Sequence, residues 1–372
     1  MNPVLRSCLS FFRRETVLCA ALLLAVVSAF FVPPSPAYLG YIDWDTLALL
    51  FSLMAVMKGY QKTGLFVSLG GRLLKMASNT RRMMLVLVFL PFVCSMAVTN
   101  DVSLITFVPF ALAVLRMAGQ EQLMIPTVVL QTAAANLGSM LTPMGNPQNL
   151  YLYAQSGMSF GELCGVMLPY VLLSGICLAA LILIRRPVPV SGVSVESGSG
   201  DPRALILYTA GFALCLLGIF GILPPIAIAA VTAVFLLIRD RKLLASVDYS
   251  LLATFVGFFI FTGNVGSMEG FQNLLAPVLE GRVLPVAVVI SQIISNVPAA
   301  LLLSGFTNEW RELIIGCNLG GLGTLIASMA SLISYKFAVR EYPEQKGKYL
   351  FWFTVCNVGL LAVLLVESIA LS

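Results

Sequence analysis

The stretch Ser95-Met96-Ala97-Val98-Thr99-Asn100-Asp101 lies deep inside apolar sequence, and Asp101 is the only formally charged residue between positions 83 and 115. Its two hydroxyl side chains are four residues apart, a spacing that places them on one face of a helix. A second cluster with this spacing, again followed by asparagine, is Ser291-Gln292-Ile293-Ile294-Ser295-Asn296. Because polar groups are costly in apolar surroundings, the sequence predicts one small polar site that is built twice.

The composition indicates a membrane protein. Of the 372 residues 59% are hydrophobic and only 10% are charged, whereas a soluble globule carries about 25% charged residues. The mean hydropathy is +0.95. The eight cysteines form no CxxC pair, which argues against a zinc site or a disulfide framework. The chain has no histidine, which removes His-based metal and triad chemistry. We therefore expect an all-α polytopic membrane protein.

The N-terminal half, residues 1–184, divides into apolar runs. We predict spans, a hairpin and a broken helix, in the order 16–32, 46–57, hairpin 83–115, broken helix 123–153 and 160–184. A cleaved signal peptide is the alternative for the first run, but the loop Pro33-Pro34-Ser35-Pro36 favours a span that ends there. The mixed basic and apolar segment 58–82 predicts an interfacial amphipathic helix.

Two features of the N-terminal half predict backbone groups inside the membrane that are not hydrogen-bonded within a helix. The arms of the hairpin, about 16 and 14 residues, are shorter than the roughly 20 residues that a spanning helix needs, so we expect a re-entrant hairpin. The second feature is Thr142-Pro143-Met144-Gly145-Asn146-Pro147-Gln148-Asn149. Its prolines and glycine break a helix, and broken backbone at depth is tolerated only inside protein or along a cavity. A plain proline-kinked helix is the alternative.

A polar Ser/Gly linker, 185–203, precedes the C-terminal half, residues 204–372. We predict its elements as 204–220, 223–238, 249–264, a short amphipathic piece 266–282, hairpin 283–304, broken helix 313–335 and a last span 349–370.

The two halves match in order, which predicts an internal repeat of the transporter type. Asp43-Trp44 opens a span in one half and Asp248-Tyr249 opens a span in the other. An Asn-Leu-Gly triplet begins at Asn136 and again at Asn318, and each is followed by threonine at the sixth position. Continued without gaps, the alignment pairs Thr142 with Thr324, Gly145 with Ala327, Asn146 with Ser328 and Asn149 with Ser331.

Charge predicts the orientation. With nine full spans and hairpins that return to one side, all but Arg282 and Arg311 of the 22 lysines and arginines lie on one face. The positive-inside rule makes this face cytoplasmic. We therefore expect a multi-pass protein of the cytoplasmic (inner) membrane, with the N-terminus inside, the C-terminus outside and the two repeats inverted. The excess of lysine and arginine is explained by the orientation of the protein in the membrane, so no nucleic-acid partner is expected.

The hairpin tips and helix breaks supply the chemistry. Helix ends at mid-depth leave free carbonyls, which suit a small hard cation, and free N–H groups, which suit an anion. The alternative is that these polar residues only hold helices together. The candidates for binding a cation or proton are Ser95, Thr99, Asn100, Asp101, Gly145, Ser291, Ser295, Asn296 and Ala327.

Asp101 is the one charged group at either tip. An ionised carboxylate at depth is costly, so we expect it to hold a proton or a cation. The alternative is a residue in contact with water at the end of a fully spanning helix. Its counterpart in the second tip is Val297, which cannot titrate.

These motifs resemble the ion transporter superfamily, which includes arsenite permeases, NhaD-type sodium/proton antiporters, citrate permeases and divalent anion/sodium symporters. The sequence is most similar to the YbiR type of inner-membrane anion permease. The resemblance covers nearly the whole chain and rests on Ile42-Asp43-Trp44, Thr99-Asn100-Asp101, Leu141-Thr142-Pro143-Met144-Gly145-Asn146-Pro147-Gln148-Asn149-Leu150, Ser295-Asn296-Val297-Pro298 and Gly321-Leu322-Gly323-Thr324-Leu325-Ile326-Ala327-Ser328.

The resemblance implies a scaffold domain, an elevator-type transport domain with two re-entrant hairpins, and a homodimer. In the sodium/dicarboxylate relatives each tip is Ser-Asn-Thr, and its asparagine and threonine touch substrate carboxylate. Both threonines are missing here, and Asp101 replaces one of them. This departure puts a dicarboxylate substrate in doubt and is closer to the Ala-Asn-Asp pattern of arsenite permeases.

We therefore predict a secondary active transporter for a small inorganic or organic anion in the lipid bilayer, coupled to H+ or Na+. No cofactor and no metal other than a coupling Na+ are expected. The alternatives are a cation/proton antiporter of the NhaD type that uses Asp101, an arsenite-type efflux permease, and a channel or non-transporting scaffold. No nucleophile–base pair indicates an enzyme. The candidates for contacting substrate are Asn100, Asp101, Asn146, Gln148, Asn149, Asn296, Val297, Thr324 and Ser328.

Overall fold

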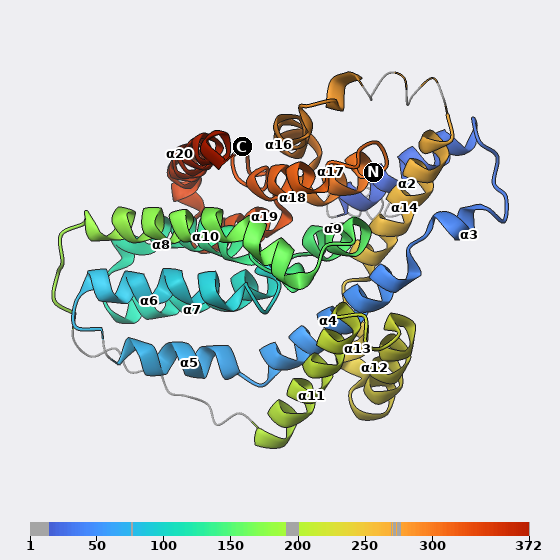
Figure 1. Ribbon diagram of the computed structural model, residues 1–372. Helices are drawn as coiled ribbons and strands as arrows, with labels where there is room; N and C mark the ends of the chain where they lie inside the picture. Colours follow the sequence, from blue (N-terminus) through green and yellow to red (C-terminus); the bar gives the residue numbers. More distant parts are fainter. Residues whose placement is uncertain are drawn as a thin grey trace, which may run out of the picture.

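The protein is a bundle of helices (Figure 1). The computed structural model describes residues 15–75, 77–190, 201–268, 270, 273 and 277–371. Within these ranges the only strand-like pairing is an isolated bridge between Asn79 and Pro189. Five of the described helices are long and apolar enough to cross a membrane. The expectation of an all-α polytopic membrane protein is confirmed.

The helices of the N-terminal half fall within or close to the predicted apolar runs. They are α2 (Thr16–Ala29), α3 (Tyr38–Tyr41), α4 (Trp44–Lys62), α5 (Leu65–Leu74), α6 (Thr80–Cys94), α7 (Asn100–Met117), α8 (Met124–Ser139), α9 (Pro147–Ser156) and α10 (Phe160–Leu183), with short 3-10 turns η1 (Glu121–Leu123) and η2 (Pro143–Gly145).

The helices of the C-terminal half follow the same pattern, and the predicted piece 266–282 lies largely outside the described residues. They are α11 (Pro202–Ile219), α12 (Pro225–Arg239), α13 (Arg241–Ala245), α14 (Tyr249–Gly266), α16 (Val283–Ile294), α17 (Asn296–Leu303), α18 (Trp310–Leu319), α19 (Met329–Glu341), the 3-10 turn η3 (Pro343–Gln345) and α20 (Lys346–Leu371).

Two predicted lengths differ from the structure. Helix α4 continues to Lys62, so the predicted amphipathic segment shortens to α5. The second hairpin arm is longer than predicted, because α7 has 18 residues and is apolar enough to cross a membrane. Pro109 lies inside α7 and does not end it, since a proline in a buried helix can be accommodated by its neighbours.

The aspartates that open the matched spans both act as helix caps. The carboxylate of Asp43 accepts a hydrogen bond from the backbone N–H of Thr46 at 2.9 Å, and that of Asp248 accepts one from Leu251 at 2.9 Å. Each satisfies an N–H that the first helical turn leaves free. The sequence match between the two halves therefore reflects the same local structure at the start of α4 and α14.

The helices form two groups (Figure 1). In one group α2 packs along α14, and α4 packs against α11 and α12. In the other group α8 packs against α6, α7 and α20, while α16 packs against α18. The breaks that follow α8 and α18 lie in this second group.

Helix α8 is the core of the second group, with every residue buried except Pro126. Its Gln131 amide donates hydrogen bonds to the carbonyls of Leu87 in α6, at 2.8 Å, and Phe107 in α7, at 3.3 Å. The Leu87 carbonyl needs this partner because the residue four positions later is Pro91, which has no N–H. One glutamine thus joins both arms of the first hairpin.

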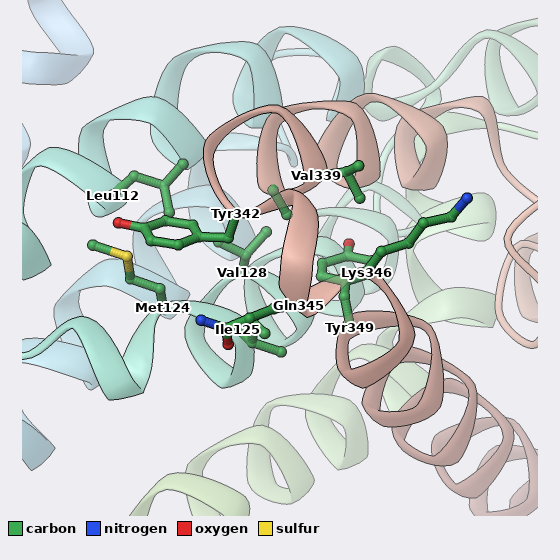
Figure 2. Close-up of a pocket in the computed structure, with 10 residues that line it drawn as sticks. Leu112, Met124, Ile125, Val128, Val339, Tyr342, Gln345, Lys346 and Tyr349 are labelled. Carbon is green, nitrogen blue, oxygen red and sulfur yellow. The ribbon is translucent and has the colours of Figure 1, made fainter.

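Two sets of contacts join distant segments at positions that the sequence assigns to the two membrane faces. On the predicted cytoplasmic face Lys62 pairs with Asp240, whose pKa is held below its usual range by this hydrogen-bonded ion pair. Arg116 pairs with Glu341 at 2.8 Å. Neighbouring Tyr342 borders a small cavity of about 10 Å³ lined by Leu112, Met124 and Tyr349 (Figure 2).

Contacts of the second set join segments predicted on the opposite face. Gln155 donates to Asp43 at 2.8 Å, and the hydroxyls of Tyr151 and Ser304 share a hydrogen bond of 2.7 Å. The ion pairs Lys62–Asp240 and Arg116–Glu341 both lie on the predicted cytoplasmic face. The order of crossings and the orientation of the termini stay predictions.

We predict that Gln131→Leu lowers the free energy of unfolding by about 1–3 kcal/mol, because the freed carbonyl of Leu87 loses its partner in a buried site. Thermal unfolding of the purified protein in detergent measures this. The matched control is Gln122→Leu, since Gln122 is exposed and precedes the same helix. Equal thermal stability of the two variants would contradict the structural role given to Gln131.

Candidate functional site

Both predicted helix breaks are present as gaps between helices. Helix α8 ends at Ser139 and α9 begins at Pro147, with the short turn η2 between them. Helix α18 ends at Leu319 and α19 begins at Met329. Most residues of both breaks are buried, so their backbone groups depend on protein partners.

The two hairpin tips differ. The first tip leaves the helix for the five residues between α6 and α7. The second consists of Ser295 alone, which has φ 78° and ψ 154°. This conformation is normally restricted to glycine, and no other non-glycine residue in the described ranges has a positive φ. The second tip therefore stores backbone strain that the first does not.

Each tip packs on the break of its own half, and the contacts are equivalent. The Thr142 hydroxyl donates to the carbonyl of Met96, and the Thr324 hydroxyl donates to the carbonyl of Gln292 at 3.2 Å. These threonines are paired by the sequence alignment, and so are the residues that accept their hydrogen bonds.

Close glycine contacts repeat in the same way. A Cβ at Gly138 would lie 2.7 Å from the Ser95 hydroxyl oxygen, and a Cβ at Gly320 would lie 2.6 Å from that of Ser291. Both distances are shorter than Cβ atoms tolerate, so both positions require glycine. Ser95 and Ser291 donate their hydroxyl hydrogens to carbonyls of their own helices, at 3.0 and 2.7 Å.

The asparagine of each half binds the broken helix of the other half. Asn136 accepts from Ser328 at 3.1 Å and donates to Ser331 at 3.2 Å. In the reverse direction Asn318 accepts from Asn146 at 3.3 Å and donates to Asn149 at 2.6 Å. All six side chains are buried. They form two sets of three, which Ser139 joins, because its hydroxyl accepts from Asn146 at 3.2 Å and donates to the backbone carbonyl of Asn136 at 2.9 Å. We call the whole cluster the asparagine cross.

The first tip joins the asparagine cross directly. The Asn100 amide donates to Asn136 at 3.1 Å, and the Asn100 side-chain oxygen accepts from the backbone N–H of Asp101 at 2.9 Å. The side chain of Asp101 is half-buried, and its carboxylate has no hydrogen bond or ion pair within the described part of the chain. The binding of a proton or a cation by this carboxylate stays a prediction.

The second tip is tied to its own break instead. The carbonyl of Ala327 accepts from the backbone N–H of Asn296 at 2.9 Å and from the Ser295 hydroxyl at 3.3 Å. This carbonyl, a predicted cation ligand, is thus already engaged by the tip. Val297 is buried beside it and offers no polar atom.

The remaining predicted residues differ in their burial and in their contacts. Gly145 fits against the backbone of Ser139, where a Cβ would lie 2.1 Å from the carbonyl oxygen. Gln148 is buried, and Thr99 is partly exposed at the first tip. Thr324 is exposed, and both its N–H and its hydroxyl are used by Gln292. Thr324 therefore holds the second tip, and its contact with substrate stays a prediction.

Three side chains with central contacts were not among the predicted site residues: Asn136, Asn318 and Gln292. Asn136 and Asn318 begin the Asn-Leu-Gly triplets that match between the halves. Their identical spacing to Thr142 and Thr324 is the sequence feature that could have identified them as site residues. Gln292 bridges its tip to the backbone of Gly320 and Leu322, each at 2.9 Å. It lies between the two serines that defined the second cluster, and nothing in its spacing marked it.

The described residues contain no group of three or more histidine, cysteine, aspartate or glutamate side chains that could hold a metal ion. A coupling cation at this site would therefore be bound by neutral oxygens and at most one carboxylate. Hydroxyls, amide oxygens and carbonyls of this kind suit a hard monovalent cation. Buried helix breaks between apolar helices are typical of membrane transporters.

Comparison with known proteins identifies the family. A family model described as citrate transporter (CitMHS) matches residues 9–307. The inner membrane protein YbiR of Escherichia coli (strain K12) is 29% identical over 324 residues, covering 85% of this chain and 86% of that protein. An uncharacterized transporter of Methanocaldococcus jannaschii is 30% identical over 308 residues, covering 80% and 82%. A protein named putative transporter arsB in Dictyostelium discoideum is 26% identical over 143 residues, which covers only 38% of this chain. The chain belongs to the citrate transporter (CitMHS) family, which confirms the predicted membership of the ion transporter superfamily.

The strain at Ser295 gives a prediction. We expect Ser295→Gly to raise the free energy of unfolding by about 1 kcal/mol, because glycine adopts this backbone conformation without strain. Ser291→Gly is the matched control and should lower stability, since Ser291 lies in regular helix. Thermal unfolding in detergent measures both changes. A Ser295→Gly protein less stable than the parent would show that the hydroxyl contact with Ala327 outweighs the strain.

Proposed function

We propose that the protein is a secondary active transporter that moves a small anion across the cytoplasmic membrane, coupled to H+ or Na+. The observation that carries the proposal is the asparagine cross, in which each half of the chain binds the broken helix of the other half. A polar centre made jointly by two matched halves at membrane depth is typical of alternating-access transporters.

The matched contacts support the inverted repeat that the sequence predicts. The pairs Thr142/Met96 and Thr324/Gln292 are equivalent in the alignment, and the glycine–serine contacts are equivalent too. Helices of one half also pack against helices of the other half. Helix α2 of the N-terminal half lies along α14 of the C-terminal half, and α12 of the C-terminal half lies along α4 of the N-terminal half. The grouping of the helices in Figure 1 is compatible with a scaffold group and a moving transport group.

Helix polarity favours an anionic substrate. Helices α7, α9, α17 and α19 all begin at or beside the asparagine cross. Helix N-termini carry partial positive charge and unpaired N–H groups, which attract anions. The described residues of both tips and both breaks offer no lysine or arginine. We infer that the helix N-termini, with Asn100, Asn146, Asn149 and Asn296, provide the contacts to the anion.

Asp101 provides the coupling in this proposal. Its carboxylate lies in the first turn of α7, where an ionised form would repel an incoming anion. Binding of H+ or Na+ removes this repulsion, so cation and anion bind together more strongly than either alone. The second tip has Val297 at the equivalent place and lacks such a switch.

The test is anion uptake into proteoliposomes with an imposed proton or sodium gradient, using citrate and arsenite as probes. We expect Asp101→Asn to abolish the dependence of uptake on the cation gradient while the protein folds normally. Glu121→Gln is the matched control, because Glu121 is exposed in the turn after α7 and lies off the asparagine cross. Unchanged dependence on both cations in Asp101→Asn would contradict the coupling role.

The unpartnered carboxylate of Asp101 also favours a second candidate, a cation/proton antiporter in which both ions share this site. The antiporter predicts that adding Na+ outside the vesicles changes the internal pH with no citrate or arsenite present. Anion transport coupled to the cation predicts no such change. The same vesicles, loaded with a pH-sensitive dye, distinguish the two functions.

A further inference from the structure

A second site of interest lies away from the asparagine cross, on the outer surface of the second helix group. A groove of about 390 Å³ runs between α10 and α20, with α8 as its floor. Many of the residues that line each wall are three or four positions apart in sequence, as expected for one face of a helix. The walls and floor are formed by residues of α10 from Cys177 to Leu181, by Ile184 and Arg185 directly after α10, by residues of α20 from Trp352 to Val363, and by residues of α8.

The groove faces the hydrocarbon of the bilayer. Ile184 and Trp352 on its two walls are 79% and 45% exposed. Large apolar side chains exposed on membrane-spanning helices lie against lipid. From Trp352 to Val363 the α20 wall rises about 16 Å, which is close to half of the roughly 30 Å hydrocarbon thickness. The groove therefore has the length of one lipid leaflet.

One end of the groove is basic. The Nε atom of Arg185 is buried and has no hydrogen-bond partner, and no acidic side chain lines the groove. Lys348 is exposed one turn before Trp352, on the same face of α20. Arg186 is exposed directly after Arg185. An unpaired guanidinium at the edge of hydrocarbon favours a phosphate oxygen as its partner.

The position of this basic end matches the headgroup layer. Arg185 and Lys348 both lie on the face that the charge distribution predicts to be cytoplasmic, where anionic lipids gather and attract basic residues. Trp352 at the same level is a typical residue of the membrane interface. The apolar groove and its basic end thus match the two parts of one phospholipid molecule.

We propose that this groove is a binding site for an anionic phospholipid of the bilayer. An acyl chain lies along the faces of α10 and α20, and the phosphate is bound by the Arg185 guanidinium, with Lys348 beside it. The bound lipid fills the space between α10 and α20, and its phosphate meets the part of the Arg185 side chain that remains exposed at the end of the groove. The proposal does not depend on what the protein transports.

The experiment is native mass spectrometry of the full-length protein in mild detergent, titrated with phosphatidylglycerol or phosphatidylcholine. We expect the parent protein to retain phosphatidylglycerol in preference to phosphatidylcholine. Arg185→Gln should bind phosphatidylglycerol roughly tenfold more weakly, the loss expected for one charge-assisted hydrogen bond. The matched control is Arg203→Gln, because Arg203 is exposed on the same predicted face and does not line the groove.

A second pair of variants tests the groove itself. A Cβ at Gly359 would meet no atom within 4 Å, so Gly359→Phe should fold and fill the groove. Gly165→Phe, an equally open position on α10 outside the groove, is its control. We expect only Gly359→Phe to lose the bound lipid, and thermal unfolding verifies that both variants are folded.

Three results would overturn the proposal. One is retention of phosphatidylglycerol by folded Arg185→Gln or Gly359→Phe at the level of the parent. Another is equal retention of the two lipids by the parent protein. The third is a dimer in the parent that only Gly359→Phe converts to monomer, which would show that a second copy of the chain occupies the groove.

Discussion

Backbone N–H and C=O groups inside a bilayer have no water to bond, and the rest of this structure depends on how the protein satisfies them. Two helices break inside the bundle, and prolines remove further N–H groups. Side-chain amides supply the missing partners: Gln131 for the carbonyl freed by Pro91, and Gln292 for the carbonyls of the second break. Asn149 does the same in the first break, where its amide donates to the carbonyls of Met140 and Thr142 at 3.0 and 3.2 Å.

This constraint explains why the side chains of the asparagine cross make so many hydrogen bonds with one another. The asparagine cross joins segments that are 169 to 195 positions apart in sequence. Each amide both donates and accepts, so few polar atoms in the cluster lack a partner. A cluster satisfied in this way is stable in an apolar interior, whereas a partly satisfied one destabilises it. An arriving ion or anion therefore has to replace contacts that the protein already makes with itself.

Local chemistry in the sequence was enough to predict the helices and both breaks, because proline, glycine and amide clusters act within a few residues. The equal spacing from Asn136 to Thr142 and from Asn318 to Thr324 is the basis of the predicted alignment of the two halves. The exchange of contacts between the halves was not predictable, since it depends on how distant segments pack. The strain at Ser295 and the exposure of Thr324 were missed for the same reason, and α7 exceeded its predicted length because its proline is tolerated within a packed bundle.

The reciprocal hydrogen bonds also have a consequence for biogenesis. Asn136 is synthesised 192 residues before Ser328, one of its partners. At a synthesis rate of about 5–20 residues per second, this partner follows roughly 10–40 s later. During that interval the first half has only its internal contacts, such as the bond from Asn100 to Asn136, and lacks the partners that the second half supplies. Water or the insertion machinery must occupy the place of these missing partners, so the N-terminal half cannot reach its native structure before the C-terminal half has been made.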